Sequence, residues 1–356
     1  MTPYAASPMR TPATVAHYCG GDREWQAAVL AACPSLRSEY LPPRWARSGH
    51  VQNVLAVLRT DYAPVVAWDS EDRLVMEDGG TVSVQWLGTD APAGTPVLVA
   101  LHTICGSGEA LRRFLVAMHR RLGWVVAACN RRGHGDLPLT APQVNTMGST
   151  QDFRSQLAHI EARRPGAPLY GVGVSAGSGL IVRYLGEEGA RSRLRAGVAV
   201  CPAYDIEHAF RYVDRLYDRY LTRALVRFFA ERFRSELVGA PGYAECVAAR
   251  SLGEFHDHLY GLAGYADAAS YYAGSNPMKV ALGMKVPLLV LNAQDDPVCV
   301  ERNVHEQLAA LQSLPRVTVA LSRHGGHCGF FHGPRARDNW ADDVIAEYLA
   351  AAHAAL

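Results

Sequence analysis

The chain has 356 residues, of which 49% are hydrophobic and 19% charged, and this is enough apolar sequence for one large buried core. Its 35 basic and 34 acidic side chains leave a net charge of +1, so no overall attraction to nucleic acid or to an anionic membrane surface follows. The eight cysteines occur without a C-x-x-C pair, which excludes the ligand spacing of a zinc finger and favours a reducing compartment.

Residues 1–70 are mixed in pattern and rich in proline and alanine. A helical pattern covers residues 24–32, and residues 1–21 lack the continuous apolar run of a secretory signal. No stretch of the chain reaches the roughly 20 apolar residues that span a bilayer. We therefore expect residues 1–70 to be an extension that packs on the core, in a cytoplasmic protein without an integral membrane segment.

The next part of the chain predicts a sheet. Residues 74–87 alternate apolar and polar side chains about Asp78, Gly79 and Gly80, which is typical of a β-hairpin. Short apolar runs follow, separated for the most part by helical patterns: 97–101, 125–128, 169–174, 197–200 and 286–291, with a weaker sixth at 317–321. This alternation predicts an α/β fold with a mostly parallel, doubly wound sheet. The predicted core comprises residues 71–202 and 284–356.

The fourth and fifth apolar runs are separated by about eighty residues, far more than a crossover connection needs. This interval is helical in pattern and dense in phenylalanine and tyrosine. We interpret residues 203–283 as an inserted helical cap over the carboxyl edge of the sheet. Most of these aromatic side chains are expected to form the core of the cap itself.

A candidate nucleophile lies in residues 173–177, which read G-V-S-A-G between an apolar run and a helical segment. This is the strand–turn–helix setting of the G-x-S-x-G motif. Gly173 and Gly177 leave the space that a sharp turn needs, and Ser175 would present its hydroxyl at the strand end. A chain with 32 glycines can contain this pentapeptide by chance, so the motif alone is weak support for a nucleophile. The assignment of Ser175 therefore depends on whether a base and an acid follow other strands.

Those partners follow the last two apolar runs. A serine hydroxyl needs a neighbouring base, and the base needs an acid to orient it. Asp295 and Asp296 follow the fifth run, and His324 and His327 follow the sixth, in the chain order that α/β-hydrolases use. We predict that His327 is the base and Asp296 the acid. Of the alternative residues, Asp295 is expected to cap its loop and His324 to have a structural role.

Attack on an ester carbonyl places negative charge on its oxygen, which N–H donors must stabilise. The amide of Ala176 is the first predicted donor. The second is expected from the loop after residues 97–101, with the amide of Ile104 preferred and that of Thr103 next. Cys105 lies in the same loop, but no histidine is assigned to it, so we expect it to serve packing. We expect neither a cofactor nor a metal ion to take part.

Five segments in order resemble one known family: 49–53 (GHVQN), 130–135 (NRRGHG), 251–277, 292–297 (NAQDDP) and 324–330 (HGGHCGF). Together they are similar to the α/β-hydrolase family that joins bacterial YheT-like hydrolases to eukaryotic ABHD-type (AB hydrolase 4) lipases and esterases. The resemblance covers most of the chain. It implies an α/β-hydrolase fold and cofactor-free serine hydrolysis of carboxylic esters, either lipid-like esters of medium or longer acyl chains or small esters.

The chain departs from the family pattern at three places. Thr103 follows His102 where the family usually has glycine, which would reshape or narrow the oxyanion loop. Ser178 takes the place of a second glycine after the nucleophile, and its small side chain is expected to be tolerated. The hydrophobic N-terminal anchor of the eukaryotic members has no counterpart here, which favours a soluble enzyme.

Three functions compete at this stage. The first is an ester hydrolase that acts on a small-molecule ester through an acyl-enzyme. The second is an acyltransferase that uses the same triad to pass the acyl group to an alcohol or amine. The third is a non-catalytic binding protein on this scaffold, which the intact serine, acid and histidine disfavour. A dehalogenase or an epoxide hydrolase would need a carboxylate in place of Ser175. Acyl chain length and oligomeric state do not follow from the sequence.

Overall fold

The structure is a computed structural model that describes residues 15–61 and 67–356. The remaining parts of the predicted extension, residues 1–14 and 62–66, lie outside the described residues. A nine-stranded sheet forms the centre, in the order β1-β9-β8-β7-β6-β4-β5-β3-β2. Its strands are β1 (Val15–Cys19), β2 (Ser70–Val75), β3 (Thr81–Leu87), β4 (Val97–Leu101), β5 (Val125–Asn130), β6 (Leu169–Val174), β7 (Leu194–Val200), β8 (Leu288–Ala293) and β9 (Val317–Ser322).

The six strands β4 to β9 pair only in parallel with one another. Antiparallel strands close both edges, β1 against β9 on one side and the hairpin β2–β3 against β5 on the other. The prediction of a mostly parallel α/β-hydrolase sheet is therefore confirmed, and the predicted hairpin is also present. Five of the six central strands are buried along their whole length, which explains their continuous apolar runs.

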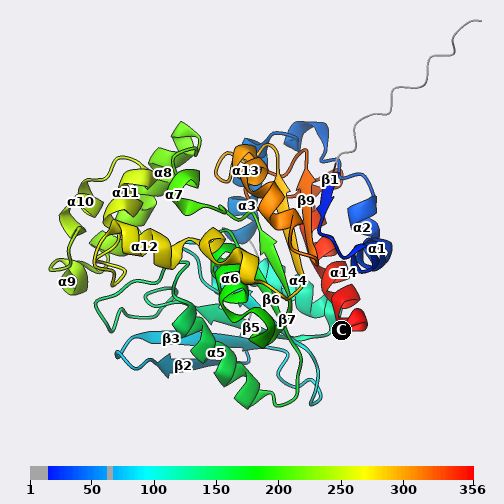
Figure 1. Cartoon of the computed structure of the whole chain (residues 1–356), viewed down its shortest axis with the longest axis horizontal. Coiled ribbons are helices and arrows are strands. Elements are labelled where there is room, and N and C mark those ends of the chain that lie inside the picture. Colours follow the sequence, from blue (N-terminus) through cyan, green and yellow to red (C-terminus); the bar gives the residue numbers. More distant parts are fainter. Residues whose placement is uncertain (1–14, 62–66) are drawn as a thin grey trace, which may run out of the picture.

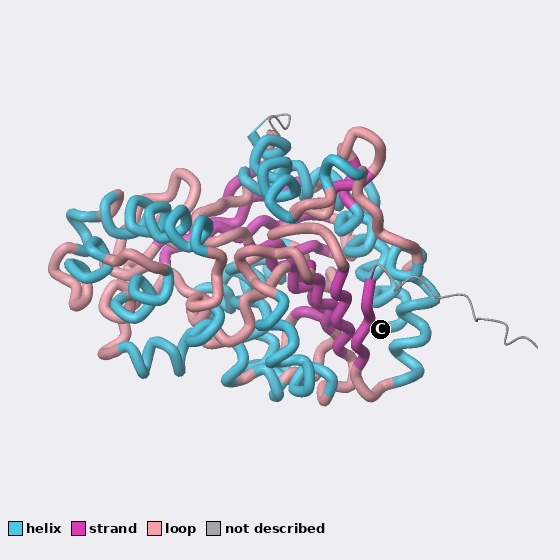
Figure 2. The backbone as a smooth tube through the Cα atoms, turned by 90° about the horizontal axis from the view of Figure 1, so that it is seen from above, coloured by secondary structure: helices cyan, strands magenta, loops and turns pink. Residues whose placement is uncertain are grey.

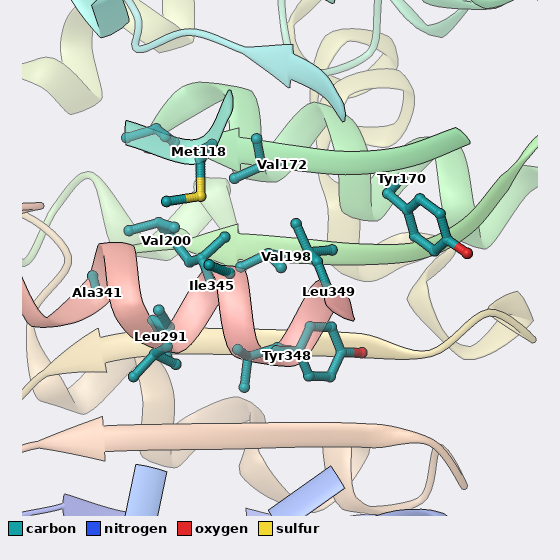
Figure 3. Packing of buried hydrophobic residues seen from close by; sticks show 14 of the residues in the cluster. Met118, Tyr170, Val172, Val198, Val200, Leu291, Ala341, Ile345, Tyr348 and Leu349 are labelled. Atoms are coloured by element: carbon teal, nitrogen blue, oxygen red, sulfur yellow. The ribbon is translucent and has the colours of Figure 1, made fainter. Parts of the chain in front are cut away.

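Helices cover both faces of this sheet, as Figure 2 shows. One face packs against α1 (Arg23–Ala32), α2 (Pro34–Arg37), α4 (Arg112–Leu122) and α14 (Trp340–Ala355). The other packs against α5 (Thr150–Arg163), α6 (Ala176–Glu188) and α13 (Glu301–Gln312). Figure 3 shows how α14 lays Ile345 and Leu349 over Val198 of β7. The doubly wound arrangement predicted from the sequence is confirmed.

The chain between β7 and β8 is helical and lies at one side of the molecule, away from α1 and α2 (Figure 1). Its helices are α7 (Ile206–Ala209), α8 (Arg215–Leu225), a π-helix (Val226–Glu231), α9 (Arg234–Leu237), α10 (Tyr243–Ala248), α11 (Leu252–His258) and α12 (Ala268–Ser275), followed by 3₁₀ turns at Pro277–Lys279 and Ala281–Gly283. The α- and π-helices contribute most of a hydrophobic cluster that is rich in buried aromatic side chains such as Phe229, Phe255 and Tyr271. The loop between β5 and α5 adds Leu139, Val144 and Met147 to this cluster. The bounds 203–283 for a separate cap unit stay a prediction.

Several predicted strand bounds were wrong. The fifth apolar run was expected to be a strand from residue 286, but β8 begins at Leu288, because Pro287 has no N–H to give to the ladder. It also extends to Ala293, which pairs with Ser322 of β9. β5 continues to Asn130, and β7 begins at Leu194, each beyond the run that predicted it.

Several further elements were not predicted from the sequence. β1 and α3 (Gly49–Asp61) both lie in the segment that looked mixed in sequence. A two-stranded sheet, β10 (Phe331–His332) with β11 (Asp338–Asn339), follows the loop that contains His327. Short 3₁₀ turns occupy Arg44–Ala46, Glu109–Leu111 and Gly189–Arg191. Within the described residues, no helix combines the length and the hydropathy that crossing a membrane requires.

Candidate active site

Ser175 lies in the sharp turn between β6 and α6, with φ at 53° and ψ at −117°. Left-handed φ values are rare for residues other than glycine and are found where the surrounding structure holds them. The Ser175 amide donates to the carbonyl of Val200 on β7 at 2.8 Å, which fixes the turn to the sheet.

The two glycines of the motif are required by close backbone contacts. A Cβ on Gly173 would lie 2.3 Å from the carbonyl oxygen of Gly177, and a Cβ on Gly177 would lie 2.3 Å from that of Leu101. Ser178 is tolerated where the family usually has glycine, because its buried hydroxyl donates to the Ser175 carbonyl. The motif therefore forms the elbow that the sequence predicted.

His327 connects Ser175 to Asp296. Its Nε2 is 2.9 Å from Ser175 Oγ, and its Nδ1 is 2.9 Å from Asp296 Oδ2. The second carboxylate oxygen of Asp296 accepts the amides of Val298 and Cys299, at 2.8 and 2.9 Å. The Asp296 side chain is fully buried. Its carboxylate is therefore held by three donors, and the structure brings the three predicted residues into one hydrogen-bonded array.

The electrostatics of this array favour a proton on His327. Burial disfavours the charged imidazolium, but attraction to Asp296 and the hydrogen bond to it raise the pKa of His327 well above its usual 6.5. The buried carboxylate thus stabilises the charged ring that a base becomes when it has taken a proton.

The two alternative residues face each other instead. Asp295 Oδ1 accepts the amide of Gly326 at 2.9 Å, and Asp295 Oδ2 lies 3.7 Å from Nδ1 of His324. Gly326 has a left-handed φ of 57°, and a Cβ there would lie 2.4 Å from the carbonyl of Gly49. Asp295 and His324 thus hold the loop in its close approach to α3, apart from the array.

The predicted oxyanion donors lie at the same place as Ser175. Ala176 is the first residue of α6, where the amides have no acceptor within the helix. Ile104 lies in a tight turn after β4 that is closed by the Gly106 amide donating to the Thr103 carbonyl at 3.1 Å. Thr103, Ile104 and Ala176 all line the cavity beside Ser175. Cys105 in this turn is partly buried, and burial raises the pKa of its thiol to about 12.

Buried cationic and imidazole side chains hold this turn. The guanidinium of Arg131 donates to the Thr103 carbonyl at 2.6 Å, and Nε2 of His134 lies 2.9 Å from the Ile104 carbonyl. Burial, reinforced by the charge of Arg131, lowers the pKa of His134 to about 3. That ring is therefore neutral, and its one proton can be donated to only one of the two carbonyls that the ring faces, that of Ile104 through Nε2 or that of Arg132 through Nδ1 at 2.8 Å. The Thr103 carbonyl thus receives a donor from the segment after β5, and the Ile104 carbonyl is in contact with the same segment.

A cavity of about 480 Å³ opens beside the array, a size typical of small-molecule sites. The core side of its wall includes Ser175 and His327, and α4 and α14 add Arg113 and Asp342. Those two form an ion pair at 3.0 Å, so their charges are matched. The cap contributes mostly apolar side chains: Phe210, Tyr220, Leu221, Ala224, Leu225, Leu252 and His256. The cavity thus lies between the cap and the sheet.

Sulfur atoms surround the histidine of the array. Cys201, Cys328 and His327 each offer a ligand atom within 4.8 Å of the others, and so do Asp296, Cys299 and His327. Among the described residues these are the two groups that could hold a metal ion. Burial raises the pKa of the Cys299 thiol to about 11. Both groups share His327, so a metal there would compete with Ser175 for that ring.

The sequence did not reveal every residue that supports the site. Asn53 of α3 accepts the His327 amide at 2.6 Å, and it lies in the 49–53 segment that carried the family resemblance without an assigned role. Arg131 and His134 likewise lie in the quoted segment 130–135. His256 lies in the cap interval, where nothing in the sequence separates it from the surrounding core residues.

A family profile described as "alpha/beta hydrolase fold" matches residues 96–334, which is more than half of the chain. The chain belongs to the α/β-hydrolase fold family. Two curated relatives extend the likeness. The phospholipase ABHD3 of Mus musculus is 25% identical over 333 residues, covering 90% of this chain and 80% of that protein. The putative esterase YheT of Escherichia coli (strain K12) is 27% identical over 328 residues, covering 88% of this chain and 94% of that protein.

Among solved structures, a protein of unknown function from Staphylococcus aureus subsp. aureus Mu50 superposes with a TM-score of 0.55 at 12% identity. The match covers 79% of this chain and 97% of that one. At this identity the likeness concerns the fold alone. The resemblance to ABHD-type and YheT-like α/β-hydrolases that the sequence motifs indicated is confirmed.

Proposed function

We propose that this α/β-hydrolase cleaves carboxylic esters through a covalent acyl-enzyme on Ser175. The observation that carries the proposal is the unbroken contact from Asp296 through His327 to Ser175, with both links at 2.9 Å, at the wall of the cavity. Relatives whose names include phospholipase and esterase support ester hydrolysis as the reaction class.

In the first half of the reaction, Ser175 Oγ attacks the ester carbonyl carbon while its proton passes to Nε2 of His327. The imidazolium is stabilised by Asp296. The bond from the carbonyl carbon to the alcohol oxygen then breaks, and His327 gives its proton to that oxygen. The alcohol leaves, and the acyl group stays on Ser175.

In the second half, water attacks the acyl carbon and gives a proton to His327. The bond to Ser175 Oγ breaks, the serine oxygen takes the proton back, and the carboxylic acid is released. In both halves negative charge forms on the former carbonyl oxygen. We assign its stabilisation to the amides of Ala176 and Ile104, since preorganised donors at that point are often the largest contribution to catalysis.

We infer the substrate class from the wall of the cavity and from the relatives. The cap side is mostly apolar, which suits an aliphatic chain of medium length better than a highly polar ester. Acyl transfer to another alcohol would use the same intermediate. A cytoplasmic location stays a prediction.

The test replaces Ser175 by alanine in the full chain and follows the release of nitrophenol from nitrophenyl esters of increasing acyl length. We expect a loss of at least about 1,000-fold in kcat/KM, because the variant lacks the hydroxyl that lies 2.9 Å from Nε2 of His327. Labelling by a fluorophosphonate should occur in the wild type and disappear in the variant. Turnover by Ser175→Ala at the wild-type rate would refute the proposal. Ester products formed with added alcohols would identify acyl transfer.

A further inference from the structure

His256 is a polar side chain of the cap that lies on the wall of the cavity. It belongs to α11 and lines the same cavity as Ser175, although only 3% of its surface is exposed. Its ring stacks on Phe210, with centroids 4.0 Å apart. The cap helices that hold it lie to the left in Figure 1. Burying a polar ring in a cap wall that is otherwise mostly apolar is unfavourable unless its nitrogen atoms are hydrogen-bonded.

The tautomer of His256 is fixed by its neighbour. Nδ1 lies 2.6 Å from the hydroxyl of Tyr271, which is itself buried and makes no other hydrogen bond within the described residues. The tyrosine proton therefore finds its acceptor in Nδ1, and the proton of the neutral ring lies on Nε2. Burial lowers the pKa of His256 to about 3, so the ring is uncharged at neutral pH.

The Nε2 proton of His256 has no acceptor in the described part of the chain. Three other polar side chains of the cavity wall have partners: Arg113 pairs with Asp342, and Asn339 donates to the carbonyl of Gly329. Of the residues that line the cavity, His256 is the one with a buried side-chain nitrogen or oxygen that lacks a partner among the described residues. A buried donor without an acceptor costs free energy, which a ligand oxygen would recover. Because Nε2 itself is almost completely covered, a small shift of the ring or of its neighbours must admit that oxygen.

We propose that Nε2 of His256 donates a hydrogen bond to the substrate, and that the substrate is an ester with a second, uncharged acceptor oxygen. This inference rests on the proposed ester hydrolysis for its consequence, but the binding step does not depend on turnover. A carbonyl, hydroxyl or ether oxygen fits a neutral donor. An anionic group would find no matching charge at His256. An ester whose acyl and alcohol chains contain no further polar group would leave the Nε2 donor without an acceptor. His256 thus determines specificity for substrates that carry the second oxygen.

The activity test compares butyl hexanoate with two ketone-bearing analogues in which one methylene, well away from the ester group, is replaced by a carbonyl. One analogue carries the ketone in the acyl part and the other in the alcohol part, which distinguishes the two possible orientations. We expect the wild type to prefer one of them by about tenfold in kcat/KM, since a site built around a hydrogen bond rejects a substrate that lacks it. The ratio is taken within each variant, so a general loss of activity cancels.

Three variants locate the effect. His256→Phe keeps a ring against Phe210 but has no donor, and it should reduce the preference to about onefold. Tyr271→Phe removes the hydroxyl that fixes the proton on Nε2, and it should weaken the preference less. His208→Phe changes an exposed cap histidine outside the cavity wall, and it should keep the full ratio.

A second measurement works without turnover. In Ser175→Ala protein with labelled histidine, the Nε2 proton resonance of His256, identified by its loss in the His256→Phe variant, should shift with the preferred ketone ester and not with butyl hexanoate. This shift without activity in the wild type would contradict the proposed hydrolysis and leave the binding inference intact. An undiminished preference in His256→Phe, or the absence of any shift, would overturn the inference about His256.

Discussion

Asp295 and Asp296 are adjacent in the chain, yet they have different environments. Asp296 receives two backbone amides and faces His327, whereas Asp295 holds the amide of Gly326 and approaches His324. Burial raises the pKa of Asp295. The Asp296 side chain therefore belongs to the array with His327, and the Asp295 side chain belongs to the loop with Gly326 and His324.

The raised pKa of His327 predicts how activity depends on pH. Only the neutral ring can accept the proton of Ser175, so kcat/KM should fall on the acid side with a midpoint above 6.5. Asp296→Asn removes the charge that raises this pKa. We expect that variant to lose about 1,000-fold or more in kcat/KM and to move the midpoint to lower pH. The measurement is kcat/KM on a nitrophenyl ester across the pH range.

Asp295→Asn is the matched control for this prediction. It changes the neighbouring carboxylate by the same atoms but leaves the contact between Asp296 and His327 in place. Its pH midpoint should stay that of the wild type. The assignment fails if Asp295→Asn shifts the midpoint and Asp296→Asn does not.

At the scale of elements, the turn after β4 depends on the segment that follows β5. The Thr103 carbonyl accepts a hydrogen bond from Arg131, and the Ile104 carbonyl contacts the His134 ring, so the segments that follow two adjacent strands are joined. Burial lowers the pKa of Arg131 to about 10, which reflects the cost of placing its charge here. Arg131 is thus a positioning residue for the proposed oxyanion donor.

Arg131→Met should therefore impair the reaction through the turn. We expect kcat to fall by about 10- to 100-fold with little change in KM, because misplacing one oxyanion donor weakens stabilisation that arises in the transition state. Arg120→Met changes an exposed arginine on α4 and serves as the control. An equal rise in KM with unchanged kcat would indicate that Arg131 acts on substrate binding instead.

Elements were predictable from the sequence where burial alone determines the pattern. The parallel strands are buried on both faces, so their apolar runs were visible, and the polar residues after them gave Ser175, Asp296 and His327. β1 was not visible, because five residues carry little periodicity and its partner strand lies far along the chain. Arg131 and His256 were not predictable as site residues, since only their contacts in space separate them from other buried polar side chains.

For the whole molecule, the packing of α14 on the sheet should set much of the stability. Leu349 is fully buried in the cluster of Figure 3, between this last helix and the strands. Leu349→Ala should lower the free energy of unfolding by about 2–5 kcal/mol, since it removes buried apolar atoms and leaves a cavity. Calorimetric melting measures the change. Leu356→Ala, at an exposed position, should alter stability by less than about 0.5 kcal/mol.

The first described strand has a further consequence. β1 pairs along its length with β9, so Val15 lies opposite Ser322, and the two are separated by about 300 residues of chain. During synthesis β1 leaves the ribosome long before its partner exists. The loop that carries His327 directly follows that partner strand, so this edge of the sheet and the array at Ser175 can be completed only after about 300 further residues have been synthesised.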